Sequence, residues 1–314
     1  MLSVIIPAYN ESQNIRRTFF AVKDVLNNSS IPFEILFVDD GSKDDTWLQI
    51  YHLSQSNPEV RGLSFSRNFG KESAIFAGLS ACRGDCCVIM DSDLQHPPAL
   101  IPQMYQLWKD GYEVVEAIKE TRGEESFFHK SCAKLFYKII SKLTGMDMSN
   151  ASDFKLLDRC AIDALLTMPE RAPFFRALSS WIGFHAVSIP FCVQKREIGS
   201  SKWSYVSLIR YAIQNISSFS GSPMQIVTFF GYIMLLFAFF QGIEALHSYF
   251  VGTAATGFTT VILLQLLIGS MLMISLGIIG HYISCIYNEI KARPRYIIHK
   301  TCGQSSDKNK EATQ

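Results

Sequence analysis

The feature that most restricts the fold of this 314-residue chain is a long uncharged segment toward its C-terminal end. No Asp, Glu, Lys or Arg occurs between Glu244 and Glu289, and residues 223–243 are also uncharged and rich in Phe, Leu, Ile and Met. Residues 223–243 and 258–280 are each long enough to cross about 30 Å of hydrocarbon as a helix. We therefore expect two antiparallel transmembrane helices within residues 223–290, joined by a short outer turn; the alternative is an apolar hairpin buried in a soluble core.

Basic residues flank the two expected spans and are absent from the turn between them. Because cytoplasmic flanks of membrane proteins carry an excess of Lys and Arg, this pattern places both termini and the N-terminal region in the cytosol. Residues 201–222 are amphipathic and predict a helix in the membrane interface, with packing on a soluble core as the alternative. Residues 291–314 are expected to be a basic juxtamembrane segment followed by a disordered tail. The flanking basic residues are Lys195, Arg196, Lys202, Arg210, Lys291, Arg293, Arg295 and Lys300.

Residues 1–200 have the patterning of a charged globular domain. Apolar runs at 2–6, 33–38, 60–65 and 86–90 predict strands, and helical patterns separate them, at 44–53 for example. This alternation predicts an α/β domain with a parallel sheet and helices on both faces. Ligands of such sheets bind at the carboxyl ends of the strands, where this chain carries its polar clusters. The net charge of +1 gives no indication of nucleic-acid binding, and the eight cysteines show no zinc-binding spacing.

Two carboxylates, one residue apart, follow the apolar run at 86–90. Asp91 and Asp93 can converge on one hard cation, and Gln95 can add an amide oxygen. Mg²⁺ and Mn²⁺ favour oxygen ligands and commonly complete their coordination with water and substrate phosphates. A metal at this position would neutralise charge that develops on a leaving diphosphate. The pattern predicts a metal-dependent site, with a solvated loop as the alternative.

The ends of the other three strands carry candidate nucleotide ligands. A carboxylate after the second strand can accept hydrogen bonds from a base or ribose, although a capped tight turn explains residues 40–42 equally well. After the first strand, an aromatic ring can stack near a base, and an acidic residue can bond ribose or cap the next helix. Two basic residues flank a glycine at the start of the third helix, where backbone N–H groups favour phosphate. The candidates are Pro7, Tyr9, Glu11, Asp39, Arg67 and Lys71, with Asp91 shared with the metal.

The four segments 7–11, 38–42, 67–71 and 90–98 together resemble the motif series of family 2 glycosyltransferases with a Rossmann-like GT-A fold. To about residue 300, the chain resembles the polyprenyl-phosphate glycosyltransferases, the group that includes bactoprenol glucosyltransferase and dolichol-phosphate mannose synthase. The resemblance implies an inverting transfer from a nucleotide-diphosphate sugar to a polyprenyl phosphate at the cytosolic face of a bacterial inner membrane, by a homo-oligomer. UDP-glucose is the first expected donor; GDP-mannose, an aminoarabinose-type donor and a growing polysaccharide acceptor are alternatives.

The same resemblance implies roles for residues in the second half of the domain. Segment 152–159 matches a family segment near the acceptor, in which Asp153 is the acidic residue and Lys155 replaces the usual Arg. Segment 195–203 matches one that gates the pyrophosphate and meets the lipid phosphate, with Arg196 and Lys202 as its basic residues. The resemblance assigns Asp153, Arg196 and Lys202 to catalysis.

Two further basic residues and one missing motif complete the comparison. Arg122 and Lys130 fall near positions where relatives bind phosphates, although the usual Arg is not present at Lys130. Trp181 lacks the preceding Gln and Arg that processive polysaccharide synthases carry, which disfavours that class. The acceptor of the favoured class is a phosphate monoester with a second pKa of about 6, so it needs no strong general base. Asp153 is therefore expected to orient the acceptor or contact sugar hydroxyls, and to take at most a residual proton.

Overall fold

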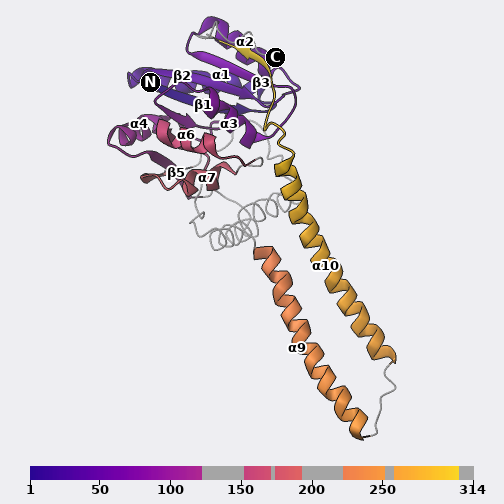
Figure 1. The fold of residues 1–314 in the computed structure, drawn as a ribbon. Helices are drawn as coiled ribbons and strands as arrows, with labels where there is room; N and C mark the ends of the chain where they lie inside the picture. Colours follow the sequence, from indigo (N-terminus) through magenta and orange to yellow (C-terminus); the bar gives the residue numbers. More distant parts are fainter. Residues whose placement is uncertain (122–151, 171–173, 193–221, 252–257, 304–314) are drawn as a thin grey trace. The chain divides into compact units, whose positions relative to one another are not determined.

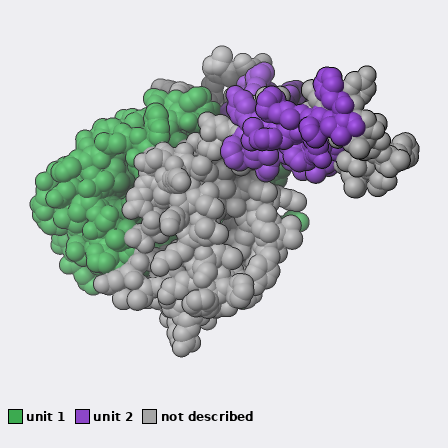
Figure 2. Space-filling model, turned by 90° about the horizontal axis from the view of Figure 1, so that it is seen from below, with its two compact units in different colours: residues 1–203, 293–314 green, residues 204–292 purple. Residues whose placement is uncertain are grey.

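The computed structural model describes residues 1–121, 152–170, 174–192, 222–251 and 258–303 (Figure 1). The chain forms two compact units, coloured separately in Figure 2. The first unit contains residues 1–203 together with 293–314, and the second contains residues 204–292. The predicted interfacial helix at 201–222 lies outside the described residues except for its last position, where a long helix begins.

The first unit is built on an eight-stranded sheet with the order β7-β5-β6-β4-β1-β2-β3-β8. Its N-terminal half is parallel, as predicted, because β1 pairs with β2 and β4, and β2 pairs with β3. The complete sheet is mixed, because β6 runs antiparallel between β4 and β5, and β8 runs antiparallel to β3. The strands are β1 Leu2–Ala8, β2 Phe33–Asp39, β3 Val60–Phe65, β4 Cys86–Ile89, β5 Val114–Thr121, β6 Lys155–Asp158, β7 Ala186–Cys192 and β8 Ile298–Cys302.

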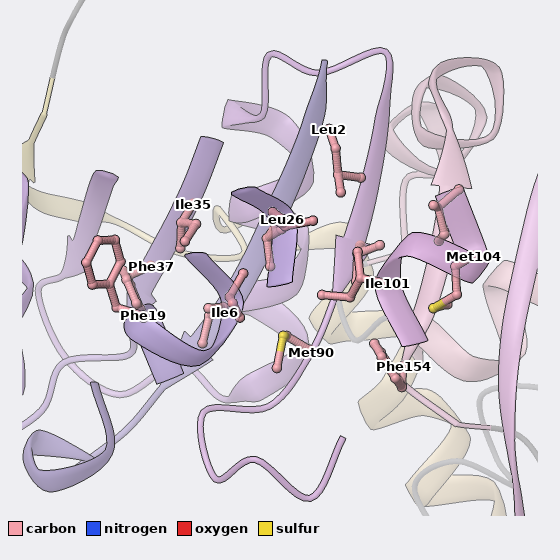
Figure 3. Close-up of a cluster of buried hydrophobic side chains, with 14 of the residues drawn as sticks. Leu2, Ile6, Phe19, Leu26, Ile35, Phe37, Met90, Ile101, Met104 and Phe154 are labelled. Atoms are coloured by element: carbon pink, nitrogen blue, oxygen red, sulfur yellow. The ribbon is translucent and has the colours of Figure 1, made fainter. Parts of the chain in front are cut away.

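Helices cover both faces of this sheet, as the alternating pattern predicts. Successive strand side chains point to opposite faces, so Leu2, Val4 and Ile6 of β1 share one core with α1, α2 and α4 (Figure 3). On the other face, Ile5 packs so closely on α3 that a Cβ at Gly78 would lie 2.3 Å from its side chain. The helices are α1 Ser12–Asn28, α2 Thr46–Ser56, α3 Lys71–Ala81, the short η1 Pro98–Leu100, α4 Ile101–Lys109, α6 Arg159–Thr167 and α7 Phe175–Trp181.

The last strand comes from the far end of the chain. β8 pairs with β3 in the register Leu63 to Thr301, and just before it the ring of Tyr296 stacks on Phe65 at 5.1 Å between centroids. Arg295 lies over the ring of Phe76 and donates a hydrogen bond to the backbone carbonyl of Met168. Residues 298–302 are thus an edge strand of the sheet within the segment for which only a basic linker and a disordered tail were expected.

The second unit contains two long apolar helices, α9 Ser222–Val251 and α10 Phe258–Ile290. They coincide with the two expected spans and extend beyond them. Among the described residues, one stretch, Leu267–Ile290 in α10, is long and apolar enough to cross a membrane, with a mean hydropathy of 1.6 and no burial inside the protein. A shorter apolar stretch, Phe229–Gln241, lies in α9. The helical prediction is confirmed, and the prediction of two membrane spans stays a prediction.

Candidate active site

The predicted ribose ligand, Asp39, holds the loop after β2 against the end of β3. Asp39 is buried, and its carboxylate accepts hydrogen bonds from the Ser42 backbone N–H at 3.0 Å and the Ser64 hydroxyl at 2.8 Å. The parallel register aligns Asp39 with Ala8 of β1 and Ser64 of β3, so it lies at the carboxyl edge where ligands of such sheets bind. The structure thus gives Asp39 a turn-forming role and also the predicted location.

Asp40 joins this loop to the loop that begins α3. Its carboxylate accepts hydrogen bonds from the backbone N–H groups of Phe69 at 2.6 Å and Gly70 at 2.9 Å. Burial raises the pKa of Asp40 to about 6, although these two hydrogen bonds oppose the increase. Gly41 has a φ of +67°, and a Cβ there would lie 2.3 Å from the backbone of Arg67, so the two loops are in close contact. The exposed Arg67 places its guanidinium 4.4 Å from the ring centroid of Phe69.

The loop after β1 packs against the loop after β2. Pro7 lies in β1 opposite Val38, and Tyr9 follows the strand in a partly exposed position. Glu11 occupies the residue before α1, and its backbone carbonyl accepts the first helical hydrogen bonds. Its carboxylate accepts a hydrogen bond from the side-chain amide of Asn14. Glu11 therefore occupies the N-cap position of α1, but its side chain does not cap the helix, and its role in binding ribose stays a prediction.

The three predicted metal ligands, Asp91, Asp93 and Gln95, lie on a short turn after β4. The backbone N–H of Asp91 donates to Nδ1 of His96 at 3.1 Å, and the ring of His96 stacks on Phe154 at 4.9 Å. The carboxylate of Asp93 accepts a hydrogen bond from the Gln95 backbone N–H at 3.1 Å. These contacts hold the turn that carries Asp91, Asp93 and Gln95 beside the segment that carries Asp153.

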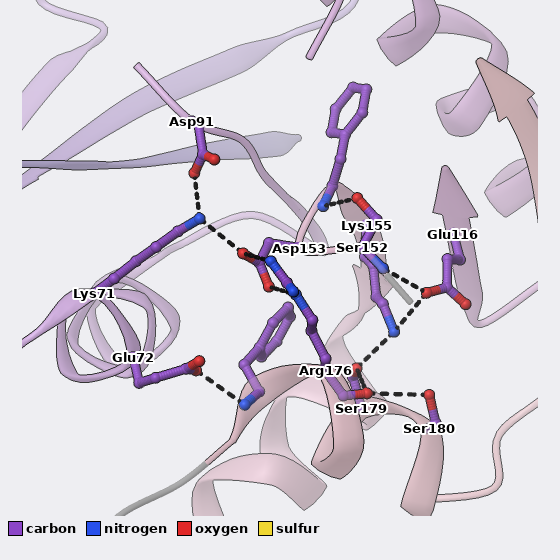
Figure 4. A network of polar contacts seen from close by, with 12 residues as sticks. Lys71, Glu72, Asp91, Glu116, Ser152, Asp153, Lys155, Arg176, Ser179 and Ser180 are labelled. Atoms are coloured by element: carbon purple, nitrogen blue, oxygen red, sulfur yellow. Dashed lines mark hydrogen bonds and ion pairs between the residues drawn. The ribbon is translucent and has the colours of Figure 1, made fainter. Parts of the chain in front are cut away.

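One ammonium group links the turn after β4 to the segment before β6 (Figure 4). Nζ of Lys71, the first residue of α3, lies 2.6 Å from Oδ1 of Asp91 and 2.7 Å from Oδ2 of Asp153. Burial lowers the pKa of Lys71, but the charges of Asp153 and Asp91 outweigh it and hold the pKa above its usual value. Lys71, predicted as a phosphate ligand, is thus an ion-pair partner of two carboxylates in this structure.

Arg176 on α7 completes the network and was not predicted from the sequence. Its Nε and Nη2 lie 2.7 Å and 2.8 Å from the two carboxylate oxygens of Asp153, in a bidentate pair. Burial would raise the pKa of Asp153, but Arg176 and Lys71 hold it well below its usual value. Glu72 anchors α7 beside this pair, since its carboxylate accepts the Phe175 backbone N–H at 2.9 Å. Asp153 is therefore a fixed, ionised carboxylate.

Lys155 supports Asp153 from within the core. Its side chain is 1% exposed, and Nζ lies 3.0 Å from Oε1 of Glu116 and 2.8 Å from the Ser179 hydroxyl. The same Glu116 oxygen accepts the Ser152 backbone N–H at 3.2 Å. Burial lowers the pKa of Lys155 despite the nearby Glu116 carboxylate. This contact chain connects β5 and β6 to α7, which carries Arg176, so the Lys that replaces the usual Arg has a structural role.

The oxygen ligands that Asp91 and Asp93 offer fit a divalent cation that binds together with a phosphate-bearing ligand. Among the residues that the structure describes, no three His, Cys, Asp or Glu side chains converge in an arrangement that could hold a metal. Two carboxylates and an amide oxygen on one turn leave several positions for water and phosphate oxygens, which suits Mg²⁺ or Mn²⁺. The pKa of Asp91 is lowered, since Lys71 and His96 outweigh the effect of burial, which favours the ionised form that a metal ligand needs.

Four predicted site residues lie outside the described ranges. They are Arg122, Lys130, Arg196 and Lys202. The described part of the site therefore comprises the ends of β1, β2 and β4, the start of α3, the segment before β6, and α7.

Comparisons with known proteins identify the family of this chain. The model of the family described as "Glycosyl transferase family 2" matches residues 3–165, about half of the chain. The chain is a family 2 glycosyltransferase. The prophage bactoprenol glucosyl transferase homolog of Escherichia coli (strain K12) is 34% identical over 301 residues, which cover 95% of this chain and 98% of that protein. This glycosyltransferase is also 36% identical over 303 residues to the uncharacterized glycosyltransferase YkcC of Bacillus subtilis (strain 168), covering 96% and 94% of the two chains.

Solved structures identify the fold of this glycosyltransferase as GT-A. Glucosyl-3-phosphoglycerate synthase from Mycobacterium tuberculosis, in complex with Mn²⁺, uridine diphosphate and phosphoglyceric acid, superposes with a TM-score of 0.53 at 18% identity, over 69% of this chain and 76% of that chain. The same enzyme with Mg²⁺ and uridine diphosphate gives a TM-score of 0.52 at 18% identity, over 70% and 79% of the two chains. At this level of identity the likeness concerns the fold alone.

Proposed function

We propose that this glycosyltransferase transfers a sugar, glucose as the first candidate, from a nucleotide-diphosphate donor to a polyprenyl phosphate, with inversion at the sugar carbon. The observation that carries the proposal is the Lys71 bridge between Asp91 and Asp153. It joins the turn expected to bind the donor with the carboxylate expected near the acceptor. Similarity to bactoprenol glucosyl transferases over 95% of the chain supports the acceptor class and the first choice of sugar.

Asp153 acts in this proposal by position and charge. A phosphate monoester is mostly dianionic at neutral pH, so it can attack without giving up a proton. Asp153, held ionised by Arg176 and Lys71, is a weak base, and its fixed carboxylate suits hydrogen bonds to sugar hydroxyls. The two cations outnumber this carboxylate and offset its repulsion of the acceptor phosphate. Orientation of the acceptor in line with the breaking C1–O bond supplies much of the rate enhancement.

The donor side of the site would hold the nucleotide and its diphosphate. Asp39 would face the base or ribose with Pro7, Tyr9 and Glu11, and Arg67 would face phosphate. Asp91, Asp93 and Gln95 would hold Mg²⁺ or Mn²⁺, which stabilises negative charge on the leaving diphosphate when it is bound. Arg122, Lys130, Arg196 and Lys202 are proposed as further phosphate contacts on the basis of the sequence resemblance.

The apolar helices fit an enzyme whose proposed acceptor is a membrane lipid. A polyprenyl phosphate keeps its tail in the bilayer, so an enzyme that uses it must work at the membrane surface. We place residues 1–200 in the cytosol as the catalytic domain, 201–222 at the interface and 223–290 in the membrane as two spans, with 291–314 on the cytosolic side. The uncharged stretches and their basic flanks support this topology in a bacterial inner membrane. A homo-oligomer is part of the proposal through the family resemblance.

A donor screen in membranes tests the proposal. Membranes containing the enzyme receive undecaprenyl phosphate and, in separate reactions, UDP-glucose, GDP-mannose or an aminoarabinose-type nucleotide donor, and the organic extract is read by mass. The expected product is undecaprenyl phosphate plus one hexose, absent without lipid and reduced in Asp153→Asn with donor binding intact. Sugar found in a polymer or a water-soluble acceptor, with none in the lipid extract, would refute the acceptor assignment.

A further inference from the structure

Lys71 bridges the proposed donor and acceptor sides of the site. Its ammonium contacts Asp91, on the turn after β4, and Asp153, in the segment before β6 (Figure 4). The two sides differ in access to solvent, because the Asp91 side chain is 30% exposed and the Asp153 side chain is 5% exposed. Lys71 itself is 40% exposed. Water and an incoming ligand can therefore reach the bond to Asp91 more readily than the bond to Asp153.

The two carboxylates also differ in how firmly they are held. Asp153 takes hydrogen bonds from both Lys71 and the bidentate Arg176, at 2.7 to 2.8 Å. Asp91 is ion-paired with Lys71 through Oδ1, and its side chain is partly exposed. Loss of the Asp91 contact would leave Lys71 attached to its buried partner, whereas loss of the Asp153 contact would disturb a buried charge cluster, which is the costlier change. The ammonium is thus anchored on one side and exchangeable on the other.

We propose that Lys71 is an exchangeable counter-cation for Asp91. It neutralises Asp91 while the donor site is empty, and it gives up this carboxylate when a divalent cation binds together with a nucleotide diphosphate. Lys71 stays on Asp153, and its freed hydrogen-bonding capacity turns to the diphosphate. The inference rests on the proposed metal site at Asp91 and Asp93, and it reconciles the phosphate role predicted for Lys71 with the ion pairs in the structure.

The positive charge of Lys71 affects how a divalent cation can bind at Asp91. A divalent cation that arrives alone must displace a cation already 2.6 Å from Asp91, and the two positive charges repel each other at short range. A cation that arrives with a diphosphate brings negative charge to which the displaced ammonium can bind. Lys71 therefore makes metal binding depend on the nucleotide, so that the site does not load with metal alone.

The test measures Mn²⁺ binding to the full-length protein in detergent micelles, by electron paramagnetic resonance, with and without UDP. Wild type is expected to bind Mn²⁺ weakly alone and much more tightly with UDP. Lys71→Met should bind Mn²⁺ alone about tenfold more tightly, with a smaller gain from UDP. Lys71→Arg keeps the charge and should behave as wild type. Lys43→Met, which removes an exposed charge from the loop after β2, is the matched control and should also behave as wild type.

Two outcomes overturn the inference while leaving the metal site in place. One is that Lys71→Met and wild type bind Mn²⁺ alone equally, although wild type still binds Mn²⁺ with UDP. The other is that Lys43→Met tightens Mn²⁺ binding as much as Lys71→Met, which would make the effect one of general charge. Absence of Mn²⁺ binding to wild type even with UDP would overturn both the counter-cation role and the proposed metal site. Thermal unfolding of each variant shows that it is folded.

Discussion

Replacing Arg176 by Met should separate the positioning of Asp153 from the integrity of the fold. The change removes two charge-assisted hydrogen bonds to a carboxylate that is 5% exposed. Each such bond contributes about 1.5–3 kcal/mol. Lys71 remains as a partner, and water can replace part of the loss because Arg176 is 26% exposed. We therefore expect a net loss of about 2 kcal/mol in the interactions that fix the Asp153 carboxylate.

That loss predicts a roughly 30-fold decrease in kcat if the transition state uses the Asp153 carboxylate in its present orientation. KM for the nucleotide donor should change little, since the turn at 91–95 is untouched. Arg176→Lys should recover part of kcat, because Lys restores one charged contact but cannot form the bidentate pair. The assay follows labelled sugar into organic-extractable lipid at saturating donor, and donor binding is measured separately.

Arg159→Met provides the matched control. Arg159 also makes partly buried hydrogen bonds, to the backbone carbonyls of Cys82 and Gly84, but it lies at the other end of β6 from Asp153. It should lower the melting temperature and leave kcat per folded molecule unchanged. The reasoning fails if Arg176→Met keeps kcat within about twofold of wild type, or if Arg159→Met loses as much kcat as Arg176→Met.

Three further predictions concern the metal, the loops and the sheet edge. Excess EDTA, or Asp93→Ala, should abolish sugar transfer, and full activity in either case would remove the metal from the mechanism. The pKa of Asp40 is raised from 3.8 to about 6, so its contribution to stability is present below pH 3.8 and is lost as pH rises through 6. The melting temperature of wild type, relative to that of Asp40→Asn, should therefore fall over this pH range. A difference between the two melting temperatures that stays constant with pH would contradict this prediction. Deleting residues 295–314 removes β8 and should lower the melting temperature by about 5 °C or more. Deleting residues 304–314 keeps β8 and should leave the melting temperature unchanged. If both deletions changed the melting temperature equally, β8 would add no stability.

The parallel half of the sheet could be predicted because each of its strands leaves a local pattern in the sequence. Each is an apolar run that ends in a polar cluster, as at Asp39 and Asp91, and both faces of such strands are buried. The strands that join antiparallel gave weaker signals. β6 has four residues and includes Lys155 and Asp158, and β8 is an exposed edge strand that contains His299 and Lys300. Their positions depend on pairing with distant strands, which hydropathy along the chain does not report.

The candidate site divides in the same way. The sequence located Asp91, Asp93 and Asp153 through local spacing and family resemblance. Arg176 was missed because its signal is tertiary: it lies 23 residues from Asp153, and within the chain it is only a lone charge in the short helix α7. Lys71 was assigned to phosphate from its place at a helix start, and its contact with Asp153, 82 residues away, could not be read from that pattern.

The return of the chain at β8 also sets an order for completing the sheet during synthesis. The outer edge of β3 is paired by residues 298–302, which are made only after α9 and α10 have been synthesised. Until then, that edge presents free backbone N–H and C=O groups, which are a site for unwanted strand pairing. The pairing of β3 with β8 is therefore the last step that completes the sheet. Any delay in the synthesis or membrane insertion of the apolar helices prolongs the time during which the outer edge of β3 is unpaired.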